Sequence, residues 1–333
     1  MRFSRKSSDE PGGGFGGGLG AGPASEKRAL VGWVVAAVVI GVLVVCLILG
    51  WYWSREPDLV RLVPEPSAET SLIEGSTTSR TVHQLMSTLL NKPGGFLSND
   101  ILPPGVWLDN MPNWEFGVLV QIRDMTRAMR RDMARSQSQS SEDPSLAVAE
   151  PRFNFDNTSW ALPASESEYR GGMEALADYI RRLERGDAEF YARADNLASW
   201  IGDVSTRLGS FSQRLSASVG RAEVTEQGRA YKRTPWLEID DVFYEARGSA
   251  WALVHLLRAV EHDYADVLER KNALVSLQQI IRDLEATQRP MHSPMVFNGS
   301  GFGVLANHSL VMANYLSRAN AALIDLRKLL EQG

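Results

Sequence analysis

The hydrophobic positions of this chain fall into two patterns. An uninterrupted apolar run without a charged residue extends from Ala29 to Gly50, and after it apolar residues recur every three or four positions among polar ones. A continuous run is typical of a helix that is apolar on every face, whereas the spaced pattern is typical of helices that bury one face. The sequence therefore predicts one N-terminal transmembrane helix followed by an all-α region.

The apolar run is long enough to cross a bilayer. As an α-helix it would rise about 33 Å, which matches a hydrocarbon core of about 30 Å. Trp33 lies near one end, and Trp51, Tyr52 and Trp53 follow the other, where aromatic rings suit the headgroup layers. We predict a transmembrane helix over residues 29–53. The alternative is a cleaved signal peptide, but its apolar core is usually only about 7–15 residues long.

The charges beside the run predict its orientation. Five basic residues precede it, whereas Arg55 and Arg61 are the only basic residues among the twenty that follow. Basic residues stay in the cytoplasm, so the bias places the N-terminus there and residues 57–333 on the opposite side. Residues 1–28 are rich in glycine and are predicted to form a disordered cytoplasmic tail. Prolines in residues 54–77 indicate a linker.

The spaced pattern predicts an elongated antiparallel helical bundle with long ordered loops over residues 78–333. A capping-box signature, Ser165 with Glu168, predicts the start of one helix. Periodic apolar residues predict helices near 78–90, 116–136, 165–185, 190–215, 240–288 and 310–330. We interpret the stretch from 240 to 288 as one long helix that Pro290 ends.

A heptad seam is the clearest periodicity in the chain. Its apolar positions are spaced alternately four and three residues apart, and they are Phe190, Ala194, Leu197, Ile201, Val204, Leu208, Phe211 and Leu215. Such a seam is typical of helices that pack at about +20° to one another. It predicts a bundle core, and the alternative is a face for self-association or for another helical chain.

Charge and cysteine usage narrow the function. Residues 57–333 carry 29 basic and 36 acidic side chains, a formal charge of −7. This balance provides no basic excess for phosphates and argues against nucleic acid as a partner. The single cysteine, Cys46, lies inside the apolar run. The outer region therefore offers no disulfide and no cysteine-based metal site, and its histidines lack metal-ligand spacing, so we predict no cofactor and no metal.

One loop concentrates the residues that suit recognition. Its two tryptophans, two asparagines and two carboxylates are able to stack on and hydrogen-bond a sugar or a peptide, and a similar segment around Trp160 is expected to pack beside it as a cap on the bundle. The candidate binding residues are Trp107, Asp109, Asn110, Asn113, Trp114, Glu115 and Trp160. The alternatives are a structural plug of the bundle, or an acid/base pair of Asp109 and Glu115 for glycan cleavage. A further glycine-rich loop at 291–303 reads as a flexible helix connection.

The same segments carry a family resemblance. The string from Leu102 to Gly117 resembles an uncharacterised family of proteobacterial membrane-anchored proteins, a domain of unknown function, and the stretches 136–140 and 153–157 resemble the same family. The resemblance implies a bacterial inner membrane, with the helical domain in the periplasm. It implies no activity and supplies no functional residues.

These observations favour a non-enzymatic interaction or scaffold protein of the cell envelope. Its expected partners are the membrane, through the single-pass anchor, and an envelope protein or a second copy, through the helices. Two alternatives stay open, since a periplasmic bundle is able to bind a small ligand between its helices as a sensor does, and the carboxylates of the loop are compatible with an envelope hydrolase.

Overall fold

The computed structural model describes residues 23–59, 73–137, 141–217, 221–225, 228–232, 238–289 and 308–332. The chain divides into two compact units, Met1–Ile48 and Leu49–Gly333. The predicted tail lies mostly outside the described residues, as do most of the predicted linker and the glycine-rich loop at 291–303.

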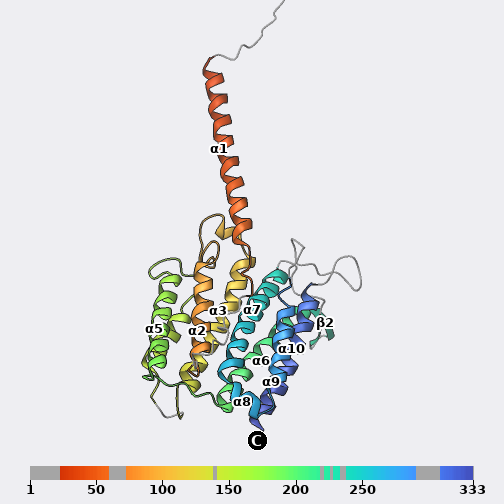
Figure 1. Cartoon of the computed structure of the whole chain (residues 1–333). Helices are drawn as coiled ribbons and strands as arrows, with labels where there is room; N and C mark the ends of the chain where they lie inside the picture. Colours follow the sequence, from red (N-terminus) through yellow and green to blue (C-terminus); the bar gives the residue numbers. More distant parts are fainter. Residues whose placement is uncertain are drawn as a thin grey trace, which may run out of the picture. The chain divides into compact units, whose positions relative to one another are not determined.

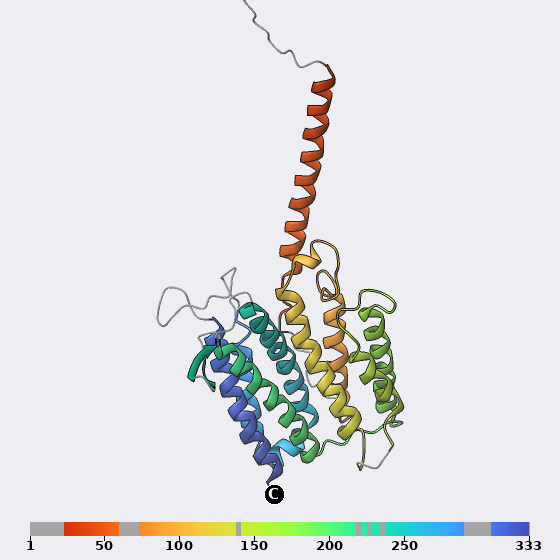
Figure 2. The same ribbon diagram turned by 180° about the vertical axis from the view of Figure 1, so that it is seen from behind.

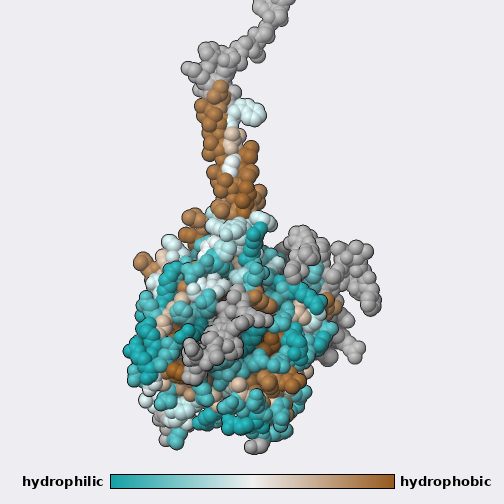
Figure 3. All heavy atoms as spheres, in the orientation of Figure 1, coloured by the Kyte–Doolittle hydropathy of each residue, from teal (hydrophilic) through white to brown (hydrophobic). Residues whose placement is uncertain are grey.

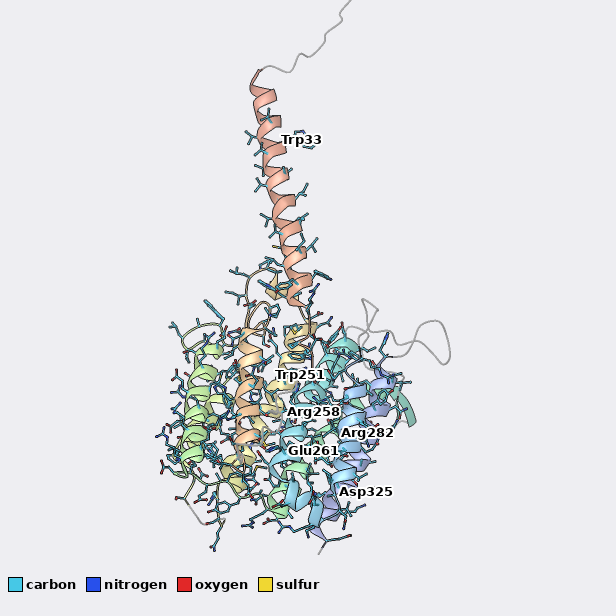
Figure 4. All side chains as sticks on the ribbon, viewed as in Figure 1. Trp33, Trp251, Arg258, Glu261, Arg282 and Asp325 are labelled. Carbon is cyan, nitrogen blue, oxygen red and sulfur yellow. The ribbon has the colours of Figure 1, made fainter. Side chains whose placement is uncertain are left out.

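The apolar run forms a single helix, as predicted. Helix α1 extends over Pro23–Trp53 and therefore begins six residues before the predicted start at residue 29. Its segment Leu30–Trp53 is long and apolar enough to cross a membrane, by length and composition. Trp33 stands out from the side of this helix in Figure 4. Most of its apolar side chains are exposed in the free chain.

In the residues that the structure describes, the second unit is helical apart from one hairpin, which confirms the predicted all-α class. In Figures 1 and 2 its longer helices lie side by side and alternate in direction along the chain. They are α2 (Ser76–Asn91), α3 (Asn110–Ala128), α4 (Pro144–Phe153), α5 (Ser165–Arg185), α6 (Ala194–Ser216), α7 (Ile239–Asp263), α8 (Ala265–Arg270), α9 (Leu274–Ala286) and α10 (His308–Glu331). A 3-10 turn covers Gly105–Trp107, and a π-helical turn, Met129–Met133, extends α3.

The heptad seam lies in the core. Its residues from Leu197 to Leu215 are buried, and α6 packs mainly on α10 and also on α7 and α3. Leu316, Leu323 and Leu326 of α10 are buried in the same way. Other helices of the same bundle therefore cover the seam, as expected if it forms part of the core.

Two glycines allow α3 and α7 to approach each other closely. A Cβ built on Gly248 of α7 would lie 2.0 Å from the carbonyl oxygen of Trp114, and one on Gly117 of α3 would lie 2.0 Å from that of Glu245. No real Cβ atom fits at such distances. The two backbones are in contact here, and this crossing fixes the first turns of α3 against α7.

One predicted helix boundary and one predicted helix cap are wrong. Helix α3 begins at Asn110 and not near residue 116, because Pro112 lies in its first turn, where a proline removes no intrahelical hydrogen bond. Helix α5 begins at Ser165 as predicted, but the capping box does not form. Ala164 is the N-cap, and the Ser165 hydroxyl donates to the carbonyls of Asp156 and Ser159.

The long helix predicted over 240–288 is also wrong, because the chain reverses between α7 and α9. Asn272 adopts a left-handed conformation with φ of 52°, which asparagine tolerates better than most residues. The N–H of Ala273 then donates to the carbonyl of Leu268 and closes the turn. Helix α9 packs back on α7, so the apolar faces of the two helices face each other.

A short antiparallel hairpin follows α6. Strands β1 (Arg221–Thr225) and β2 (Gly228–Lys232) pair from Arg221 with Lys232 to Thr225 with Gly228. The sequence predicts only helices after the apolar run, so this hairpin is a correction to that prediction.

Candidate functional site

The candidate site lies at the end of the helical domain where residues 49–53 enter it (Figure 1). Two loops meet here, the segment 92–109 between α2 and α3 and the segment 154–164 between α4 and α5. Asn99 joins them, because its side-chain amide donates to the carbonyl of Ser159 at 2.9 Å and to the carboxylate of Glu166 at 2.8 Å. We call these two segments together the loop end. The turns around 186–193 and 264–273 lie at the opposite end of the helices (Figures 1 and 2).

Glu115 holds the first loop from within. Its carboxylate is fully buried and pairs with the equally buried ammonium of Lys92 at 2.6 Å. It also accepts hydrogen bonds from the N–H groups of Leu97 and Ser98, at 2.9 Å each, and from the Ser98 hydroxyl. The Lys92 ammonium donates in addition to the carbonyl of Gly95. One ion pair thus closes the turn that follows α2 onto the first turns of α3.

This environment defines what Glu115 can do chemically. Burial raises the pKa of Glu115 above its ordinary value, and the Lys92 ammonium and the hydrogen-bond donors offset this only in part. Both carboxylate oxygens are enclosed by donors from the same chain. A general acid or base must reach the proton that it transfers. The geometry therefore gives Glu115 a positioning role in the loop.

Trp114 is a core residue. Its side chain is fully buried and packs on Trp251 of α7, with ring centroids 5.1 Å apart. Trp251 in turn packs on His255, with centroids 4.4 Å apart, and Figure 4 places Trp251 on α7 inside the helical domain. The Trp114 indole nitrogen has no hydrogen-bond partner. For this residue the structure favours the plug over a contact with a ligand.

Asp109, Asn110 and Asn113 organise the start of α3. The Asp109 carboxylate accepts from the N–H of Asn110 at 2.9 Å as the N-cap, and the Asn113 amide donates back to the Asp109 carbonyl at 3.0 Å. The same amide donates to the carboxylate of Asp241 on α7 at 2.7 Å. Partial burial, followed by the negative charges of Asp240, Asp109 and Glu238, raises the pKa of Asp241. These groups connect α3 to α7 and leave Asp109 exposed.

Trp107 and Trp160 are the two predicted aromatic side chains that are exposed, at 54% and 62%, whereas Trp114 is buried. Each lies on a loop that is fixed by hydrogen bonds. Glu115 anchors the first loop, and the Arg123 guanidinium holds the second by donating to the carbonyls of Phe153 and Phe155 at 2.7 Å. The structure therefore separates the predicted set into two buried residues, three polar residues at the start of α3 and two exposed rings.

Sequence reasoning missed two charged residues that build this end. The Arg247 side chain is only 6% exposed and binds the carboxylate of Glu56 at 2.7 Å, directly after α1. It also donates to the carbonyl of Thr287 at 2.7 Å, at the end of α9. Lys92 is the second. Neither lies in a recognisable motif, although an arginine inside the apolar pattern of α7 is a weak signal of a buried ion pair.

Taken together, the fold and this end define a class: a helical domain that begins within the last turn of a helix apolar enough to span a membrane. The family comparison assigns the chain more closely. A family model matches residues 26–333, and the chain belongs to that family, which is described as an uncharacterised protein conserved in bacteria, DUF2333. No curated protein matches the chain. No solved structure matches it.

Proposed function

We propose that this protein is a membrane-anchored, non-enzymatic interaction protein of the bacterial cell envelope. In this proposal α1 is an uncleaved single-pass anchor of the inner membrane, with its N-terminus in the cytoplasm and the helical domain in the periplasm. The basic residues before the apolar run support this orientation. Membership of a bacterial family and the length of Leu30–Trp53 support the anchor.

One observation carries the proposal, namely that the described residues directly after the candidate span, Glu56 and Asp58, are already bound to the folded domain. The second unit begins at Leu49, inside the span, and Glu56 is bound to Arg247 only three residues after α1 ends. A signal peptide is normally followed by a small-residue cleavage site that a peptidase can reach. Here the segment after the apolar run is part of the folded unit, as expected of a retained anchor.

The polar groups of the candidate site support an interaction role over catalysis. Glu115, Asn113 and Asp109 each bind another group of the chain, and these bonds fix the positions of the loops. The side chains that the loop end exposes include the two tryptophans and neighbouring apolar residues. Exposed aromatic side chains on a rigid support are common features of interaction surfaces.

The anchor is tested by extracting cell membranes at alkaline pH and measuring the intact mass of the recovered protein. Retention in the membrane with the apolar run still present supports the proposal. A mature chain that begins after residue 53, or release into the soluble fraction, would contradict it. A reporter fused to the C-terminus, active only outside the cytoplasm, tests the orientation.

The interaction role is tested with a photo-crosslinking amino acid placed at exposed positions of the full-length protein in cells. Trp107 and Trp160 report on the loop end, and Val275, which is 72% exposed at the start of α9, reports on the opposite end. Trp114 is unsuitable as a probe position, because a change there acts on the core. A reproducible adduct, either with another envelope component or with a second copy, supports the role. Absence of adducts at all three positions contradicts it.

A further inference from the structure

The loop between α2 and α3 packs directly on the last turn of α1. A Cβ built on Gly94 would lie 2.8 Å from the Trp53 ring, and one on Gly50 would lie 3.7 Å from the side chains of Leu108 and Pro104. Gly50 and Trp53 are the final residues of the candidate membrane span. If this span crosses a bilayer, the loop that contacts its end is at the level of the headgroups.

Apolar side chains project from both segments of the loop end. Six of them are more than half exposed, and they are Ile101, Leu102, Val106, Trp107, Trp160 and Leu162. In Figure 3 hydrophobic patches interrupt the otherwise hydrophilic surface at this end of the helical domain. Tryptophan and aliphatic side chains at such a level are favoured in the interfacial layer, where an indole ring buries its apolar body and keeps its N–H in a polar environment.

Trp51 and Tyr52 are exposed aromatic residues at the end of the candidate span. Both side chains are exposed, and the Arg55 guanidinium lies 4.2 Å from the centre of the Trp51 ring. Aromatic and basic residues commonly mark the end of a membrane-spanning helix. The exposed apolar surface of the loops is thus continuous with the residues that would lie in the headgroup layer.

We propose that the loop end inserts these six apolar side chains into the headgroup layer of the membrane that α1 crosses, so that the helical domain lies against the lipid surface. This inference rests on the proposed anchor and names lipid as the partner of Trp107 and Trp160. Continuity with the end of the span favours lipid over a protein partner, because the same contacts that place the loop beside Trp53 place it beside the bilayer.

The internal bonds of the loops explain why these side chains stay outward. Glu115 and Asn99 fix the first loop and its junction with the second, and both act through buried or half-buried groups. Leu162 is fully exposed and has a φ of 55°, a conformation that leucine rarely adopts. Its side chain is therefore held away from the core by a defined backbone.

Charge predicts the mode of contact. Asp109 is exposed at the loop end, and after burial the negative charges of Asp240 and Asp109 help to raise the pKa of the nearby Asp241. This local acidity gives no attraction to anionic lipids. The contact is therefore expected to depend on apolar insertion, with little response to salt, unlike a basic patch whose binding weakens as salt screens it.

The test uses the full-length protein in phosphatidylcholine vesicles. Cys46 is replaced by serine, and single cysteines at Trp107, Leu162 or Val275 carry an environment-sensitive fluorophore. A fraction of the lipids is brominated on the acyl chain, either near the headgroup or near the terminal methyl group. Flotation after alkaline extraction reports in parallel whether α1 is inserted.

We expect a blue-shifted emission for the probes at 107 and 162, and a loss of intensity that is larger with the shallow bromines, unchanged between low and high salt. The probe at 275 should behave as in water. Flotation without quenching at 107 and 162 would overturn the inference and leave the anchor intact. Failure to float would overturn the anchor, and the inference with it.

Discussion

The ion pair between Lys92 and Glu115 allows a sharp test of how the loop end is built. Replacing Lys92 by methionine keeps most of the side-chain volume and removes the only cation that the buried carboxylate contacts within salt-bridge distance in the described structure. Glu115 then keeps its hydrogen bonds from Leu97 and Ser98 but carries an uncompensated charge with no access to water. We expect the folded state to lose stability at neutral pH.

The size of the loss follows from burial. Lys92 and Glu115 are 1% and 0% exposed at their side chains, so solvent screens the pair very little. Removing one partner of such a pair typically costs about 3–5 kcal/mol. One kcal/mol shifts the melting temperature of a domain of 150–250 residues by about 2–4 °C, so a fall of roughly 6–20 °C is expected in thermal unfolding followed by circular dichroism.

The pH dependence of this variant's stability is a second, independent test of the burial argument. Burial already raises the pKa of Glu115 in the wild-type protein, and loss of the Lys92 ammonium removes a group that lowers it. A raised carboxyl pKa means that the folded state binds more protons than the unfolded state, so stability falls as pH rises through the folded-state pKa. The variant should therefore recover stability when pH is lowered towards the unfolded-state pKa, and adding Glu115→Gln should remove this dependence.

The matched control is Lys328→Met, which breaks the surface pair with Asp325. Those side chains are 60% and 72% exposed, and exposed pairs contribute about 0–1 kcal/mol. If Lys92→Met melts within 2 °C or so of this control, or if acid fails to narrow the gap from the wild type, the burial argument is refuted.

Three further outcomes follow from the contacts. Gly248→Ala should lower the free energy of unfolding by about 1–3 kcal/mol in urea titrations, because its Cβ would meet the Trp114 carbonyl. Gly209→Ala inside α6 should cost much less, because its Cβ would lie 3.3 Å from the end of the flexible Asn320 side chain and not against backbone. Arg247→Met should expose the segment around Glu56 to limited proteolysis at a protease concentration that leaves the wild type intact, because that carboxylate loses its partner. Leu162→Asn should keep or slightly raise the melting temperature, because asparagine tolerates a positive φ, and a clear fall would contradict the strain argument.

The sequence was sufficient to predict most of the helices, because their burial pattern is local. Residues spaced by three and four positions define one face whatever packs against it, and the seam from Leu197 to Leu215 is buried as expected. Reversals of the chain are harder to predict. The turn at Asn272 interrupts a pattern that continues through it, and only the packing of α9 on α7 shows that the pattern belongs to two helices.

The sequence identified the segments of the candidate site more readily than the structural roles of their residues. The density of aromatic and polar residues identified the loop, and Trp107 and Trp160 are exposed there. The roles of Trp114 and Glu115 depend on Trp251 and Lys92, which are distant in sequence and carry no motif. The residues next to a tryptophan in a loop sequence do not indicate whether its ring is buried in the core or exposed on a contact surface.

The division of the seven candidate residues has a mechanical consequence for the proposed membrane contact. Trp114 and Glu115 belong to the crossing of α3 with α7, and Trp107 lies three residues before that helix begins. Movement of the exposed ring therefore requires movement of the loop that Glu115 closes.

A variant that weakens the Lys92–Glu115 pair should loosen Trp107 without changing any lipid-facing side chain. In the vesicle experiment Lys92→Met should then reduce quenching at position 107, below the temperature at which the domain melts, while the flotation that α1 provides persists. Unchanged quenching at 107 would show that the loop holds its place without the buried pair.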